Sequence, residues 1–88
     1  MKITAIIPTF NEEIHIEEAI KSVSFADEII VIDSYSTDKT VELAKKHNVC
    51  LIQRVFDDFS SQKNHAIDQA KNDWIYILDA DELSLIHI

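Results

Sequence analysis

The chain has 88 residues, of which 47% are hydrophobic, and a formal net charge of −8. This length allows one small domain with a modest core, since a chain of this size buries only about 60–65% of the surface that its unfolded form exposes. The acidic balance argues against a nucleic-acid partner, the single cysteine excludes an internal disulfide and favours a reducing cytoplasm, and no run reaches the ~18 apolar residues of a membrane span.

Four short apolar runs predict the strands of a sheet. They are residues 3–7, 28–32, 49–52 and 74–78. Near-continuous runs of Ile, Val and Leu are typical of parallel strands that are buried on both faces. Cys50 lies in the third run, where we expect it to be a small buried hydrophobic residue.

Helix-like segments separate these runs. They are residues 11–23, 36–48 and 60–72. The expected N-caps are Asn11 for the first segment, Ser36 or Thr37 for the second, and Ser60 or Ser61 for the third. The alternation of strands and helices predicts an α/β fold, a three-layer βαβ-repeat sandwich with a parallel sheet and right-handed crossovers.

Acidic residues follow two of the predicted strands. The fourth strand and the acids after it form the stretch WIYILDADE. Ligands of open α/β sheets bind outside the carboxyl ends of the strands, so we expect Asp33, Asp79 and Asp81 to meet at one edge. Two acids at i and i+2 past a strand can hold Mg²⁺ or Mn²⁺ together with a phosphorylated ligand. Glycine is absent, which excludes the P-loop and the Rossmann GxGxxG turn.

Four motifs occur in a distinctive order: PTFNEE, VIDSYSTDKT, QKNHA and WIYILDADE. The ordered set resembles the N-terminal, nucleotide-sugar-binding part of family 2 glycosyltransferases, which have the GT-A fold and transfer a sugar with inversion. The pattern FxDFSxQKNxA is similar to the lipopolysaccharide-core β-glucosyltransferase-like group. The resemblance covers residues 3–82.

The resemblance implies roles for individual residues. The implied donor-binding residues are Pro8, Thr9, Phe10, Asn11, Glu12, Asp33, Lys63 and Asp79, and the implied metal ligand is Asp81. Phe10 would stack on a uracil ring, Asp33 would accept a hydrogen bond from the base, and Lys63 would approach the nucleotide. Asp79 would face the ribose, and Asp81 would bind the Mg²⁺ or Mn²⁺ that bridges the diphosphate.

Structural interpretations of the same residues stay open. Asp33 could begin the turn before the second helix, Phe10 could belong to the core, and Lys63 could be a solvated helix lysine. Asp79 and Asp81 taken alone would fit a solvated turn. The remaining acids have structural explanations too: Asp38 is expected in the first turn of a helix, and Asp57 and Asp58 as loop charge.

The implied function is that of an inverting glycosyltransferase fragment, which binds a UDP-hexose and a divalent metal for transfer to a cell-envelope glycan or lipid-linked acceptor. The expected location is the cytoplasm, with peripheral association at the inner face of the membrane. One alternative is a haloacid-dehalogenase-like phosphoryl-transfer enzyme with Asp79 as nucleophile, although Leu83 replaces the expected Thr or Val. Another alternative is an inactive nucleotide-binding fragment.

The end of the chain carries an expectation of its own. Residues 1–82 are expected to be the donor-binding half of a GT-A domain, and residues 83–88 a non-native tail. The tail LSLIHI is the translation of CTG TCT CTT ATA CAC ATC, which resembles a transposase adapter of sequencing libraries; a native terminus that pairs as a strand is the alternative. The general base, which takes the proton from the acceptor hydroxyl, is expected beyond this chain, so no catalytic residue is expected within it.

Overall fold

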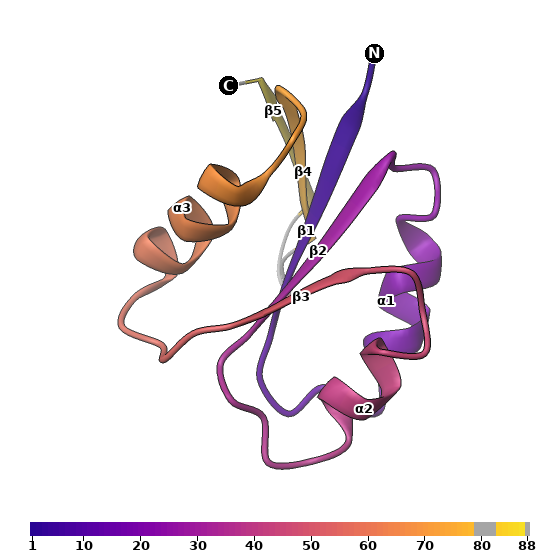
Figure 1. Ribbon diagram of the computed structural model, residues 1–88, viewed down its shortest axis with the longest axis vertical. Helices are drawn as coiled ribbons and strands as arrows, with labels where there is room; N and C mark the ends of the chain where they lie inside the picture. Colours follow the sequence, from indigo (N-terminus) through magenta and orange to yellow (C-terminus); the bar gives the residue numbers. More distant parts are fainter. Residues whose placement is uncertain (79–82, 88) are drawn as a thin grey trace.

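A computed structural model describes the backbone of residues 1–78 and 83–87 and the side chains of residues 1–78 (Figure 1). In chain order, the elements are β1 (Ile3–Thr9), α1 (Ile16–Ser22), β2 (Glu28–Asp33), α2 (Thr40–Ala44), β3 (Cys50–Gln53), α3 (Phe59–Gln69), β4 (Trp74–Leu78) and β5 (Leu83–His87). The sheet order is β3-β2-β1-β4-β5. The first four strands run parallel, and β5 runs antiparallel to β4. The predicted α/β fold is confirmed.

The sheet separates two layers of helices, with α3 on one face and α1 and α2 on the other (Figure 1). Alternate residues of a strand point to opposite faces, and β1 shows this directly. Ile6 packs in the cluster that includes Ala66 of α3. Ala5 and Ile7 pack in the cluster that includes Ile16 of α1. The apolar runs of the sequence are therefore buried on both faces.

The parallel register brings the carboxyl ends of three strands to one level. Thr9 of β1 is paired with Asp33 of β2, and Asp33 is paired with Gln53 of β3. Both β1 and β2 continue past their apolar runs to include these polar residues. The backbone continues the same pattern, since the Ser34 amide donates to the Thr9 carbonyl at 2.9 Å.

The prediction that Cys50 is buried is wrong, because its side chain is exposed. It lies on β3, which is one of the two outer strands of the described sheet. An outer strand has a neighbour on one side only, and the middle residues of β3, Leu51 and Ile52, are partly buried while both ends of the strand are exposed. An apolar run cannot reveal by itself whether its strand lies at the centre or the edge of a sheet.

The predicted starts of the first two helices are wrong. Helix α1 begins at Ile16, and the N-cap position belongs to His15 without a side-chain hydrogen bond. Helix α2 is confined to Thr40–Ala44, with Lys39 at its N-cap. Asn11 and Ser36, expected as caps, instead form hydrogen bonds between the two loops that precede these helices.

The start of α3 is also different from the prediction. Its N-cap is Asp58, whose carboxylate accepts from the Ser61 amide at 2.7 Å and from the Ser61 hydroxyl at 3.1 Å. The expected cap Ser60 lies inside the helix. Asp is among the strongest N-cap residues because its side chain satisfies an amide that has no partner in the first turn. Asp58 therefore has a structural role rather than being loop charge.

Replacing Asp58 with alanine should lower the free energy of unfolding by about 1 kcal/mol, because the Ser61 amide loses its acceptor. The measurement is urea unfolding followed by circular dichroism. The matched control is Ser60→Ala, which should be neutral or slightly stabilising, since alanine favours the helix interior. Equal destabilisation by both substitutions would contradict the assignment of Asp58 as the cap.

The last described strand, β5, lies against the outer side of β4. Their antiparallel register runs from Leu78 opposite Leu83 to Trp74 opposite His87. The segment thus pairs as a strand, as in the alternative given for the end of the chain. The origin of residues 83–88 is a property of the coding DNA and stays a prediction.

Candidate functional site

Asp33 lies at the centre of the carboxyl edge of the sheet and is fully buried. Its Oδ1 accepts from the hydroxyls of Thr9, at 2.7 Å, and Ser36, at 2.5 Å. Its Oδ2 accepts from the Ser36 amide at 2.8 Å and from Gln53 Nε2 at 3.5 Å. A carboxylate offers about four acceptor positions, so protein donors occupy the whole group. Asp33 thus joins the ends of β1, β2 and β3.

The loop after β1 is attached to the loop after β2. The side-chain oxygen of Asn11 accepts from the Thr37 amide at 2.8 Å, from the Thr37 hydroxyl at 3.3 Å and from the Asp38 amide at 3.4 Å. Asp38 in turn accepts from the Thr40 amide at 2.9 Å. Burial opposes ionisation of Asp38, but hydrogen bonds from Thr40 and the Glu13 amide outweigh it and keep the pKa of this carboxyl below its ordinary value.

A cavity of about 490 Å³ opens beside these loops. Its lining residues come from three segments: Pro8, Thr9, Phe10 and Glu12; Ser34; and Phe56, Phe59 and Gln62. The rings of Phe56 and Phe59 meet edge to face with centroids 5.1 Å apart. An apolar concavity with a few polar groups is typical of small-molecule sites.

Phe10 is not a core residue. The residue is 56% exposed, and it lines the cavity at the end of β1. The aromatic residues opposite it, Phe56 and Phe59, are exposed as well. Three exposed phenylalanines around one cavity offer flat apolar surfaces on which a planar ring could stack.

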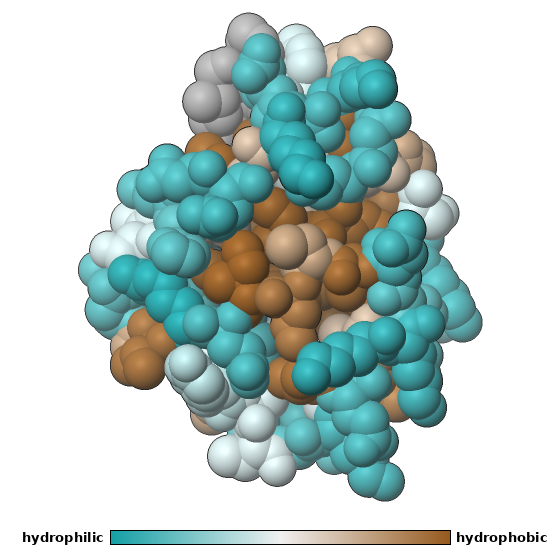
Figure 2. Space-filling view, viewed as in Figure 1, coloured by the Kyte–Doolittle hydropathy of each residue, from teal (hydrophilic) through white to brown (hydrophobic). Residues whose placement is uncertain are grey.

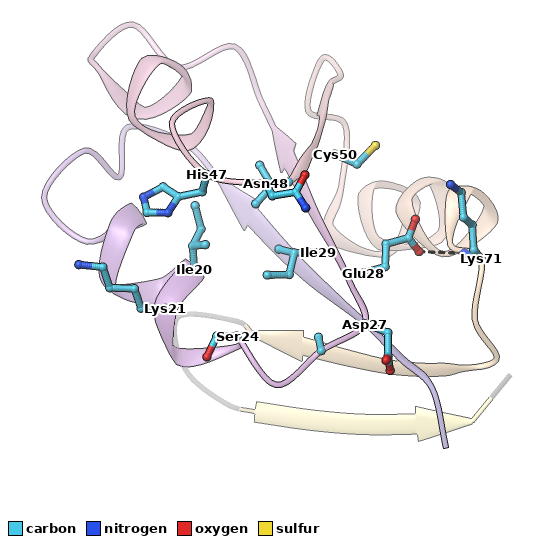
Figure 3. Close-up of a pocket in the computed structure, with 12 residues that line it drawn as sticks. Ile20, Lys21, Ser24, Asp27, Glu28, Ile29, His47, Asn48, Cys50 and Lys71 are labelled. Carbon is cyan, nitrogen blue, oxygen red and sulfur yellow. Dashed lines mark hydrogen bonds between the residues drawn. The ribbon is translucent and has the colours of Figure 1, made fainter.

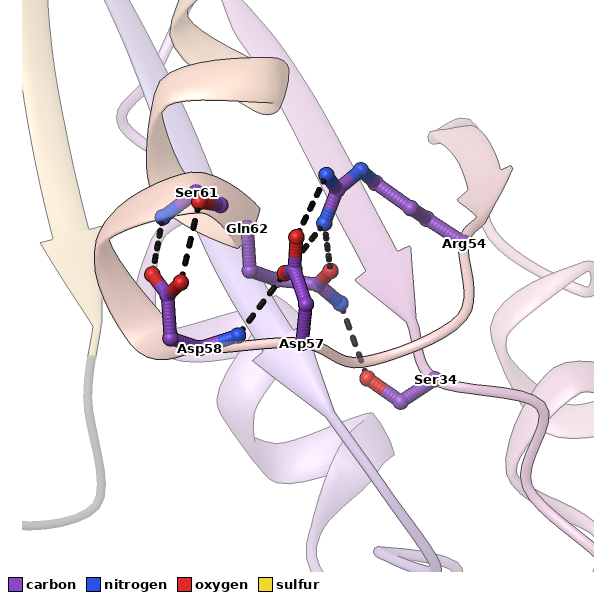
Figure 4. A network of polar contacts seen from close by, with 6 residues as sticks. All are labelled: Ser34, Arg54, Asp57, Asp58, Ser61 and Gln62. Atoms are coloured by element: carbon purple, nitrogen blue, oxygen red, sulfur yellow. Dashed lines mark hydrogen bonds and ion pairs between the residues drawn. The ribbon is translucent and has the colours of Figure 1, made fainter.

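A polar network fixes the wall of the cavity that α3 contributes (Figure 4). Gln62 is only 2% exposed, and its Nε2 donates to the Ser34 hydroxyl at 2.8 Å. Arg54 donates to Gln62 Oε1 at 3.3 Å and forms a two-pronged ion pair with Asp57, at 2.8 and 3.1 Å. Hydrogen bonds from Arg54 and from the Asp58 amide lower the pKa of the Asp57 carboxyl to about 2. Asp57 is therefore a structural residue and not merely loop charge.

The pattern of the sequence contains a trace of Gln62. It lies four residues before Ala66, which places it on the same face of α3 as this residue of the core cluster. A glutamine on an apolar face indicates a buried amide that needs partners. Ser36 and Arg54 each bond an acid three residues away, Asp33 and Asp57, and each also contacts a residue farther away in the chain.

A second cavity, of about 460 Å³, adjoins the first and shares Pro8, Thr9 and Glu12 with it. This cavity also reaches Leu78, the last residue of β4. Asp79 and Asp81 follow Leu78 in the sequence and lie outside the described residues. The described end of β4 is therefore at the predicted edge, next to the loop that follows β1.

Lys63 follows Gln62 on α3 and is partly buried. It is not among the residues that line the cavity of about 490 Å³. Among the residues whose side chains are described, no group of three or more His, Cys, Asp or Glu could hold a metal ion. No helix in the described part of the chain has the length and apolar character needed to cross a membrane.

A further cavity, of about 610 Å³, lies at the start of β2 and contains none of the predicted site residues (Figure 3). Glu28 on its wall accepts from the Lys71 amide at 2.9 Å. His47, also on this wall, has its Nε2 2.8 Å from a carboxylate oxygen of Glu17 in α1, and this hydrogen bond lowers the pKa of the Glu17 carboxyl. Figure 2 shows apolar side chains gathered in a hollow at the centre of one face and bordered by polar ones.

The parallel sheet and the helices on its two faces match solved GT-A glycosyltransferase structures. The chain belongs to the glycosyl transferase family 2, whose model matches residues 4–85. This membership leaves the haloacid-dehalogenase-like alternative without support. The acidic motif of those enzymes also normally follows the first strand, whereas the first strand here leads into PTFNE.

Relatives with similar sequences are named as glycosyltransferases. An uncharacterized glycosyltransferase of Rickettsia bellii is 48% identical over 82 residues, which cover 92% of this chain and 28% of that protein. Glycosyltransferase SunS of Bacillus phage SPbeta is 40% identical over 85 residues, which cover 92% of this chain and 20% of SunS. The chain thus spans less than a third of the length of these curated relatives.

Solved structures of glucosyl-3-phosphoglycerate synthase from Mycobacterium tuberculosis share the fold. The complex of that enzyme with Mn²⁺, UDP and glucosyl-3-phosphoglycerate has a TM-score of 0.79 and 26% sequence identity, over 90% of this chain and 33% of the enzyme. The complex with Mg²⁺ and UDP gives the same TM-score, identity and coverage. A third complex contains Mn²⁺, UDP-glucose and glycerol 3-phosphate.

Proposed function

We propose that this chain is the donor-binding part of an inverting family 2 glycosyltransferase that uses a UDP-hexose with Mn²⁺ or Mg²⁺. The observation that carries the proposal is the cavity of about 490 Å³, which the PTFNE loop and α3 enclose at the carboxyl edge of the sheet. Structural neighbours that hold UDP with Mn²⁺ or Mg²⁺ support it.

The uracil ring would lie against Phe10, because stacking of a base on an aromatic side chain contributes about 1–3 kcal/mol per base. Pro8, Thr9, Asn11 and Glu12 would form the loop around it. Asp33 would accept a hydrogen bond from the base at Oδ2, in place of the contact from Gln53. That contact, at 3.5 Å, is the longest that the carboxylate makes, so it is the one that a ligand could replace at least cost.

The diphosphate end of the donor would lie toward the end of β4. Asp79 would contact the ribose, Asp81 would bind the divalent cation, and Lys63 would approach the nucleotide. A divalent cation in this position supplies Lewis-acid stabilisation of the departing nucleoside diphosphate. The carboxylates of this chain would orient the donor and hold the cation.

The acceptor would be a cell-envelope glycan or a lipid-linked saccharide, as in the lipopolysaccharide-core β-glucosyltransferase-like group, with peripheral association at the inner face of the membrane. This part of the proposal depends on the family resemblance. The general base would be supplied beyond residue 88, and residues 83–88 would be non-native. These 88 residues alone would therefore bind the donor without transferring its sugar.

Calorimetric titration of UDP into the 88-residue chain tests the proposal. We expect binding in the presence of Mn²⁺ and much weaker binding after the metal is removed with EDTA, because carboxylates of the chain would hold the cation and the cation would stabilise the charge of the diphosphate. The affinities of the chain for UDP and for UMP should differ more with Mn²⁺ than without it, since UMP lacks the second phosphate. A cooperatively folded chain that binds UDP equally well with Mn²⁺ and with EDTA would contradict the metal assignment, and one that does not bind UDP would contradict the donor site.

A further inference from the structure

We infer that Asn11 is a positioning residue, which acts through the loop after β2 to set the shape of the nucleotide cavity. The inference rests on the proposed function for the identity of the ligand. The loop after β1 is defined here as residues 10–15, and the loop after β2 as residues 34–39. This task of Asn11 is different from direct contact with the base.

The backbone of Asn11 is in the left-handed region, with φ of 53°. This conformation costs an L-residue about 1–2 kcal/mol, although asparagine adopts it more readily than most. Tyr35, in the loop after β2, is left-handed as well, with φ of 59°. Such conformations persist where the surrounding contacts fix them, and each loop contains one of them.

The side chain of Asn11 provides the first set of contacts between the loops. Its oxygen accepts from two successive amides, those of Thr37 and Asp38, and from the Thr37 hydroxyl. The partners are 26 and 27 residues away in the sequence. A single carboxamide therefore satisfies backbone donors of a loop that has no helix of its own until Thr40.

The backbone of the loop after β1 provides contacts in the opposite direction. The Asn11 amide donates to the Ser36 hydroxyl at 2.8 Å, and that hydroxyl donates to Asp33. The Glu12 amide donates to the hydroxyl of buried Thr40 at 2.7 Å. The Glu13 amide donates to the Asp38 carboxylate at 3.2 Å. Each loop thus donates hydrogen bonds to the other. A shift of one loop alone would break these bonds.

These contacts bear on the cavity because part of its lining belongs to the same two loops. Phe10 and Glu12, the neighbours of Asn11, line it from one side, and Ser34 lines it from the loop after β2. Phe10 is exposed, so packing alone does not fix its position. A wall that is fixed before binding avoids the entropy cost of ordering loops around the ligand. Asn11 would therefore raise nucleotide affinity through preorganisation.

Three substitutions separate the two properties of Asn11. Asn11→Gly permits the left-handed backbone but removes the side-chain acceptor, Asn11→Ala removes both, and Asn11→Asp keeps both. The first measurement is hydrogen exchange of the Thr37 and Asp38 amides by NMR in the 88-residue chain. We expect about fivefold to tenfold faster exchange in the Gly and Ala variants, from the loss of a hydrogen bond, and protection near the original level in the Asp variant.

The second measurement is UDP affinity with Mn²⁺. The Gly and Ala variants should bind about threefold to tenfold more weakly, and Asn11→Asp should restore most of the affinity. Asn48→Ala is the matched control. It removes an exposed carboxamide from the cavity of about 610 Å³ at the start of β2, and it should change neither measurement. Unchanged exchange or unchanged affinity in Asn11→Gly would overturn the inference. If the original chain does not bind UDP, the proposed function fails, while faster exchange in Asn11→Gly would still support the connection between the loops and unchanged exchange would overturn it.

Discussion

Replacing Asp33 with alanine should lower the free energy of unfolding by about 2–4 kcal/mol. The substitution removes the acceptor of the Thr9 hydroxyl and of the Ser36 amide and hydroxyl, and a buried donor left without a partner costs about 1–3 kcal/mol. A chain of this length has a total stability of about 4–13 kcal/mol. The loss is thus a large share of the whole, and urea unfolding monitored by circular dichroism would measure it.

Two further variants test the physical reason. Asp33→Asn keeps the shape and one acceptor oxygen, but its NH₂ group is a donor that faces the Ser36 amide or the hydroxyls. The free energy of unfolding of this variant should therefore lie between that of the original chain and that of Asp33→Ala. Asp68→Ala removes an exposed acid from α3 and should stay within about 0.5 kcal/mol of the original chain. A value for Asp33→Ala as small as that of Asp68→Ala would contradict the central role of Asp33.

The strands could be predicted from the sequence because the information is local. Parallel strands that are buried on both faces need apolar residues without interruption, and β4 has the predicted bounds, Trp74–Leu78. The ends of β1 and β2 extend further than their apolar runs since Thr9 and Asp33 are paired across the sheet. Polar residues at a strand end reveal this pairing only once the neighbouring strand is known.

The starts of the first two helices could not be predicted, because the candidate caps bind residues outside those helices. An asparagine or serine side chain can bind the first turn of its own helix or another segment. Asn11 and Ser36 bind the facing loop and Asp33, and the helices begin several residues later. Asp58 differs, since its partner Ser61 lies in the first turn of its own helix. The stretch DFSS therefore contains a local signal for this N-cap.

The site could be predicted in part. Its edge follows from the order of strands, and the structure places Thr9 and Asp33 together there, with Phe10 exposed beside them. The aromatic wall of Phe56 and Phe59 could not be predicted, because it depends on how the segment after β3 returns over the sheet. Gln62 was not predicted, although its spacing to Ala66 places it on the apolar face of α3.

Asp81→Ala should abolish the Mn²⁺-dependent part of UDP binding. Two of the described carboxylates at this edge have other tasks: Asp33 is fully occupied by protein donors, and Asp38 accepts from Thr40 and the Glu13 amide. A divalent cation bound with substrate phosphates takes one or two protein carboxylates. Glu12 lines the cavity as well, and it is the proposed function that assigns the cation to the acids that follow β4.

The expected loss of UDP affinity in Mn²⁺ is on the order of 100-fold or more, since even the outer partners of a metal site contribute about 10–100-fold. Calorimetry with Mn²⁺ and with EDTA separates the metal-dependent part, and in EDTA the variant and the original chain should bind UDP equally weakly. Asp73→Ala is the matched control, because it removes the same charge just before the other end of β4. If Asp73→Ala weakened binding as much as Asp81→Ala, general electrostatic attraction of Mn²⁺ to an acidic chain would explain the effect, and Asp81 would lose its assignment as the metal ligand.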